Sequence, residues 1–185
     1  MPERDLTEFR AAAHGGAITH IVVEYGRTLT EWGDRVDLNL GMRPVSTTAR
    51  DAMRAVAEAG VTLALLSNAR AWQDRRPALA AAGIDGLFGD RVFLSHEIGV
   101  AKPDPAAFEY VLNNLGTAPA EVLAVGNDYA HDIAPAAHIG MRAVLVSRWP
   151  IGKRRPSTTW ISNITSLPVL LTGAPKREPA GGGAT

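Results

Sequence analysis

The sequence contains no cysteine, which excludes disulfide bonds, thiolate nucleophiles and cysteine-ligated metals. It has no apolar run approaching the roughly 20 residues that a membrane-spanning helix needs. Its first residues are charged where a secretion signal would have an apolar core. Basic and acidic residues number 19 each, so no excess of one charge attracts nucleic acid or an anionic membrane. We therefore expect a cytoplasmic protein that binds neither nucleic acid nor membranes.

The chain does contain ample apolar material, since 46% of its 185 residues are hydrophobic, which suits one domain with a substantial core. Short apolar runs alternate with helical patterns, as in α/β proteins. This alternation predicts a single α/β domain in which a parallel sheet has helices on both faces. The expected strands are residues 18–23, 62–66, 92–94, 122–125 and 143–146.

Capping residues and glycines mark the helices expected between these strands. Thr48 and Asp51 have the spacing of a capping box, and Asp104 followed by Pro105 is typical of a helix start. Pro77 should interrupt its helical segment, because proline lacks the backbone N–H. The expected helices are 48–59, 71–82, 105–115 and a shorter one between Asp132 and Gly140.

Three regions are expected along the chain. Residues 1–17 form an N-terminal extension with some helical character, and residues 18–172 form the α/β domain. Residues 173–185 end in a glycine-rich sequence with too little apolar surface to order, so a flexible tail is expected.

Polar residues follow several of the predicted strands. Glu24 follows the first strand, Ser67 and Asn68 follow the second, and Asp128 follows the fourth, while Lys102 lies in a loop before a helix. Ligands of open parallel sheets bind beyond the carboxyl ends of the strands, so these residues are expected to cluster. Structural roles are also open: Ser67 can cap a helix, and Lys102 can be a solvated surface charge.

The order of these segments resembles the haloacid dehalogenase-like (HAD) superfamily, whose members are mostly Mg-dependent phosphatases. The matching segments are EYGRTL at 24–29, LLSN at 65–68, VAKPDP at 100–105, and VGND at 125–128 with Asp132. The resemblance implies a Rossmann-like HAD domain. Only residues 30–60 separate the first two segments, and this is too short for a large cap.

The resemblance implies a nucleophilic Asp at position 24 and an acid/base Asp at position 26, where this chain has Glu24 and Gly26. The extra methylene of Glu24 displaces its carboxylate by roughly 1 Å, and such a displacement can cost on the order of a hundredfold in rate. Gly26 has no proton donor, and general acid catalysis is worth about 10²–10⁴-fold. Ordinary phosphatase turnover is therefore expected to be low, altered or lost.

The resemblance also assigns ligand-binding roles. Donors for the phosphoryl oxygens would be Thr28, Ser67, Asn68 and Lys102. Ligands for Mg²⁺ would be Glu24, the backbone carbonyl of Gly26, Asn127, Asp128 and Asp132. Asn127 stands at the usual ligand position without a charge, so weak Mg²⁺ binding is expected, and either Asn127 or Asp128 can be the ligand. Asp132 can instead interact with a helix dipole.

Two functions fit these residues. The first is a Mg-dependent phosphohydrolase of low or altered activity, and this is the label that family resemblance favours. The second is a non-catalytic relative that binds a phosphorylated small molecule or a protein partner. The replacement of both catalytic carboxylates favours the second function.

Overall fold

The protein is described by a computed structural model over residues 17–149 and 159–172. Six parallel strands form one sheet in the order β3-β2-β1-β4-β5-β6. They are β1 (His20–Val23), β2 (Thr62–Ser67), β3 (Val92–Leu94), β4 (Val122–Gly126), β5 (Arg142–Val146) and β6 (Trp160–Ile161). The expected α/β class with a parallel sheet is therefore confirmed. The expected tail at 173–185 and nearly all of the N-terminal extension lie outside the described residues.

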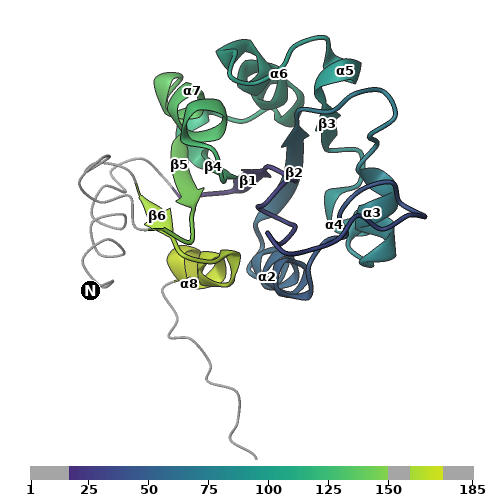
Figure 1. Ribbon diagram of the computed structural model, residues 1–185. Helices are drawn as coiled ribbons and strands as arrows, with labels where there is room; N and C mark the ends of the chain where they lie inside the picture. Colours follow the sequence, from purple (N-terminus) through teal and green to yellow (C-terminus); the bar gives the residue numbers. More distant parts are fainter. Residues whose placement is uncertain (1–16, 150–158, 173–185) are drawn as a thin grey trace, which may run out of the picture.

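Helices cover both faces of the sheet (Figure 1). The helices are α2 (Thr47–Glu58), α3 (Arg76–Ala81), α4 (Asp85–Phe88), α5 (Ser95–Ile98), α6 (Pro105–Leu115), α7 (Ala134–His138) and α8 (Leu167–Thr172). Short helical turns are η1 (Pro119–Glu121), η2 (Tyr129–Ile133) and η4 (Ile164–Ser166). No helix in the described part of the chain is long and apolar enough to cross a membrane.

The two faces of the sheet carry two separate hydrophobic cores. Ile21 and Val23 of β1 pack into the core beneath α2, α3, α4 and α8. Val22, between them, belongs to the other core, which α6 and α7 cover. Successive side chains of a strand point to opposite faces, so a strand covered on both sides must be apolar throughout. This explains why the continuous apolar runs of the sequence are strands.

Two expected helix starts are wrong in detail. Ser46 caps α2, because its hydroxyl accepts a hydrogen bond from Ala49 N at 3.2 Å. Thr48 is already helical and donates to Glu31 instead of forming the predicted capping box. The helix expected over 71–82 is confined to α3, where Pro77 occupies the second position. Proline is tolerated there because the first N–H groups of a helix have no partner within the helix.

Several short elements were not predicted from the sequence. β6 has two residues and extends the sheet beside β5, and α8 buries Leu167 and Leu170 against the core. α4 and α5 have four residues each. Segments of this length are too short to show a hydrophobic period, so tertiary packing determines them.

The strand order determines where a ligand-binding crevice forms at the edge of the sheet. The chain runs from β1 outward to β3 in one direction and from β4 outward to β6 in the other. Such a reversal opens a crevice at the carboxyl ends of the two central strands, here β1 and β4. Within the described residues, the segment between β1 and α2 contains only loops and one bridge between Asp37 and Met42. No large cap built from residues 24–46 therefore covers this edge.

Candidate active site

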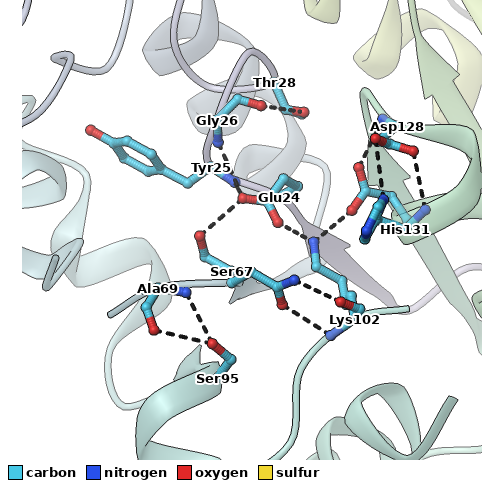
Figure 2. A network of polar contacts seen from close by, with 12 residues as sticks. Glu24, Tyr25, Gly26, Thr28, Ser67, Ala69, Ser95, Lys102, Asp128 and His131 are labelled. Atoms are coloured by element: carbon cyan, nitrogen blue, oxygen red, sulfur yellow. Dashed lines mark hydrogen bonds and ion pairs between the residues drawn. The ribbon is translucent and has the colours of Figure 1, made fainter. Parts of the chain in front are cut away.

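Glu24 lies directly after β1, at the central crevice. One of its carboxylate oxygens, Oε1, accepts hydrogen bonds from the backbone N–H of Tyr25 at 2.8 Å and of Gly26 at 3.2 Å. The same oxygen accepts the Ser67 hydroxyl at 2.9 Å, from the end of β2 (Figure 2). Hydrogen bonds to an ionised acceptor are the strong ones, so these three donors fix the carboxylate in one orientation.

Lys102 fills the space beside Glu24. Its side chain is 3% exposed, and its ammonium group forms an ion pair with Glu24 Oε2 (Figure 2). It forms a second ion pair, at 2.6 Å, with Asp132 Oδ1. Asn68 holds the backbone of this lysine, because its amide donates to Lys102 O at 2.7 Å and its carbonyl accepts from Lys102 N at 2.9 Å. The solvated-surface interpretation of Lys102 is therefore excluded.

Glu24, Lys102 and Asp132 form a buried charge triad with two carboxylates and one ammonium. Burial by itself lowers the pKa of Lys102, but the charges of Glu24 and Asp132 outweigh burial and raise it. Burial raises the pKa of Asp132, and the Glu24 charge adds to this effect while Lys102 opposes it. The lysine therefore stays protonated, and burial makes Asp132 the member of the triad that holds a proton more readily than a free carboxyl group.

Asp132 reaches the triad because Gly126 has no side chain. A Cβ atom on Gly126 would lie 2.3 Å from the Cβ and Oδ2 atoms of Asp132, which no real contact allows. Asp132 lies within the π-helical turn η2, and its Oδ2 accepts from Asp128 N at 2.9 Å. Its contacts are thus those of a partner for Lys102, not of a residue that stabilises a helix dipole.

Gly126→Ala should therefore destabilise the protein. The added methyl group must displace Asp132, and forced overpacking costs about 1–3 kcal/mol. Urea unfolding monitored by circular dichroism measures the loss. Gly26→Ala is the matched control, because no atom lies within 4 Å of its added Cβ. Equal stability of the two variants would contradict the assigned placement of Asp132.

Asp128 directs its carboxylate to its own turn. Oδ1 accepts from Ala130 N at 2.9 Å and His131 N at 3.2 Å, while Oδ2 lies 3.2 Å from His131 Nδ1. Burial alone would raise the pKa of Asp128, but the hydrogen bonds from His131 and Ala130 outweigh it and lower the pKa. Asp128 therefore caps the turn after β4 as an ionised group.

The carboxylates that the family resemblance assigns to Mg²⁺ are engaged by cationic side chains of the protein. Mg²⁺ needs oxygen ligands in near-octahedral geometry, usually including carboxylates. Here the Lys102 ammonium occupies the space between Glu24 and Asp132, and Asp128 is engaged by His131. Over residues 17–149 and 159–172, no three His, Asp or Glu side chains are grouped to hold a metal. The Gly26 carbonyl faces the Thr28 hydroxyl at 3.5 Å.

An open cleft of about 380 Å³ lies above the charge triad. Its lining includes Asn68 and Asn127 from the predicted site, together with the triad, Asp128 and His131. Thr28 and Ser67 are 4% and 0% exposed and are not part of this lining, and Thr28 lines a separate pocket with Thr30 and Ser46. The lining also contains three arginines that the sequence did not single out as ligand-binding residues: Arg27, Arg43 and Arg75. Arg27 and Arg43 come from the connection between β1 and α2, and Arg75 comes from the loop between β2 and α3, so no local sequence signal links all three.

Residues 5–140 match the family model of haloacid dehalogenase-like hydrolases, and the chain therefore belongs to this family. It is 32% identical over 126 residues to Phosphatase MT3486 of Mycobacterium tuberculosis, covering 68% of this chain and 55% of that protein. It is 31% identical over 130 residues to (S)-2-haloacid dehalogenase 2 of Pseudomonas sp., with the same coverage of both chains.

Among solved structures, the fold is similar to that of a HAD phosphatase from Thermococcus onnurineus, with a TM-score of 0.60 and 26% identity. That match covers 70% of this chain and 59% of the other. The chain spans about half the length of the curated relatives named above. The relatives include a phosphatase and a dehalogenase, so family membership alone does not fix the reaction.

Proposed function

We propose that this HAD-like protein binds a phosphorylated ligand in the cleft and hydrolyses phosphate esters slowly or not at all. The observation that carries the proposal is the state of Glu24, the residue at the nucleophile position. One oxygen accepts three hydrogen bonds and the other is paired with Lys102. An attacking carboxylate needs an oxygen free to approach phosphorus in line, and neither oxygen of Glu24 is free.

The position that the family resemblance gives to the acid/base residue also lacks a proton donor. Gly26 has no side chain, and the lowered pKa of Asp128 keeps this carboxylate ionised at neutral pH. A general acid works best with a pKa near the operating pH. Asp132 accepts from Lys102 and from Asp128 N, so its oxygens are occupied by donors. Neither Gly26 nor Asp128 is therefore suited to general acid catalysis.

The second candidate is a Mg-dependent phosphohydrolase of low or altered activity. It is favoured by the placement of Glu24 at the crevice between β1 and β4, in contact with Ser67 and Lys102. Either a phosphorylated small molecule or a phosphorylated side chain of a protein partner suits the open cleft. We place this function in the cytoplasm, as the composition predicts.

Phosphate and vanadate should raise the melting temperature of the wild-type protein, because a ligand that binds only the folded state stabilises it by mass action. Hydrolysis of p-nitrophenyl phosphate should stay near background with Mg²⁺ and with a chelator. An unmoved melting temperature at saturating oxyanion would overturn the ligand class. Rapid hydrolysis that Glu24→Ala abolishes would instead establish the second candidate.

A further inference from the structure

We propose that the phosphate group of the ligand is held in the cleft by Arg43 and Arg75, and not by the buried Lys102. This inference rests on the proposed function and names the side chains that recognise the ligand. Of the three arginines that line the cleft, Arg27 follows β1, Arg43 precedes α2 and Arg75 precedes α3. Tertiary structure brings all three to one cleft.

A single buried aromatic ring positions two of these arginines. Tyr25 is 2% exposed, and the guanidinium carbon of Arg75 lies 4.8 Å from the centre of its ring. The Tyr25 hydroxyl donates to the Arg43 carbonyl oxygen at 2.5 Å. Tyr25 therefore supports the Arg75 head group and the Arg43 backbone together. Side chains held in place before binding lose less conformational entropy when the ligand arrives.

Among the residues that the structure describes, Arg75 has only weak, neutral partners. Its guanidinium lies 3.4 Å from Ser67 Oγ, 3.5 Å from Asn68 O and 3.8 Å from Met42 Sδ, all beyond the usual hydrogen-bond range for nitrogen and oxygen. Arg43 uses its Nε to donate to the Asp34 carbonyl at 2.8 Å. Both guanidinium groups thus keep donors that can bind an oxyanion.

The charge partners of the arginines support the same conclusion. Across residues 17–149 and 159–172, ion pairs with carboxylates are formed by Arg50, Arg76 and Arg91, and none is formed by the three cleft arginines. A planar guanidinium without a carboxylate partner suits a phosphate group, which it can bind through two parallel hydrogen bonds.

Lys102 is in the opposite situation. Its ammonium is already shared by two carboxylates and its side chain is almost fully buried. Two of its three donors are therefore occupied, and an anion that approached it would meet the carboxyl groups of Glu24 and Asp132. Lys102 is therefore the counter-ion of the buried carboxyl groups, while the arginines supply the positive charge that faces the ligand. The expected ligand group is a phosphate monoester dianion, whose remainder extends out of the open cleft.

Calorimetric titration of inorganic phosphate and of phenyl phosphate tests this assignment. Arg75→Ala and Arg43→Ala should each weaken phosphate binding by about tenfold or more, the usual effect of losing a hydrogen bond to a charged group. Arg75→Lys keeps the charge but loses the planar fork, so its affinity should be intermediate. Arg54→Ala is the matched control, because Arg54 lies on α2 and donates to the Gly83 carbonyl, away from the cleft. Its affinity should equal that of the wild type.

Different results would overturn the arginine assignment and the proposed function. Wild-type affinity in Arg43→Ala, Arg75→Ala and Arg75→Lys would overturn the arginine assignment and leave the proposed function standing. Absence of phosphate and phenyl phosphate binding by the wild type would overturn the proposed function itself. Melting curves of every variant confirm that it is folded, and Arg75→Lys keeps the test decisive if Arg75→Ala is unstable.

Discussion

Replacing Lys102 by methionine should lower the free energy of unfolding by about 3–5 kcal/mol at neutral pH, as is usual when one partner of a buried ion pair is removed. The ammonium is the shared counter-ion of Glu24 and Asp132, and its side chain is 3% exposed. Without it, two carboxylates remain close together in a buried site. Urea unfolding of wild type and Lys102→Met measures the difference directly.

The matched control replaces all three ionisable side chains of the triad. Lys102→Met combined with Glu24→Gln and Asp132→Asn removes the unpaired carboxylates, and this triple variant should recover most of the lost stability. Replacement of a whole buried ion-pair group by uncharged residues is often close to neutral, in contrast to removal of one partner. A Lys102→Met deficit below about 1 kcal/mol, the usual limit for exposed pairs, would contradict the buried triad.

The deficit should also depend on pH, and its sign follows from Asp132. Burial raises the pKa of this carboxyl even with Lys102 present, so loss of the ammonium should raise it further. An acid with a higher pKa in the folded than in the unfolded state lowers stability when ionised, and this penalty disappears as the pH falls. The Lys102→Met deficit should therefore be smaller at pH 5 than at pH 7. An unchanged deficit would mean that Asp132 is not the destabilising group.

The combined change Glu24→Asp plus Gly26→Asp should raise p-nitrophenyl phosphate hydrolysis by at least about a hundredfold over the wild type, the lower end of general acid catalysis. The first substitution returns the shorter carboxylate that the family resemblance implies at the nucleophile position. The second supplies the missing proton donor. Neither change alone should suffice, because attack and leaving-group protonation belong to one transition state.

The loop after β1 has room for these changes. A Cβ atom on Gly26 would have no atom within 4 Å. Arg27 adopts φ 56°, a left-handed conformation that favours glycine, so the loop has kept a glycine-like backbone. Adding Arg27→Gly relieves the strain of that residue and removes its bulk. The triple variant therefore tests whether Arg27 obstructs turnover.

The assay is run for each variant with Mg²⁺ and with a chelator, and Glu24→Ala is the control that removes the carboxylate. If the double and triple variants both remain at the wild-type rate, the loop has lost the geometry that turnover needs. Strong wild-type turnover that survives Glu24→Ala would place the nucleophile elsewhere, and our assignment of the site would be wrong.

The strands of the central sheet and the helix α6 were determined by local sequence. β1, β2 and β4 are buried on both faces, so continuous apolar runs were sufficient to predict them within about two residues. α6 runs from Pro105 to Leu115, with Asp104 as its N-cap and Gly116 as its left-handed C-cap. Caps act through neighbouring backbone groups, and for this reason sequence alone predicted both ends.

The edge of the sheet where the site forms was also predictable, because parallel strands all end on the same side. The contacts within the site were decided only by the tertiary structure. Lys102 meets Glu24 from 78 positions away and Asp132 from 30, and the sequence does not state that both carboxylates share one ammonium. The arginines of the cleft were missed for the same reason. Charged side chains on loops have no periodicity, and only the packing of Tyr25 under Arg75 and beside Arg43 brings them together.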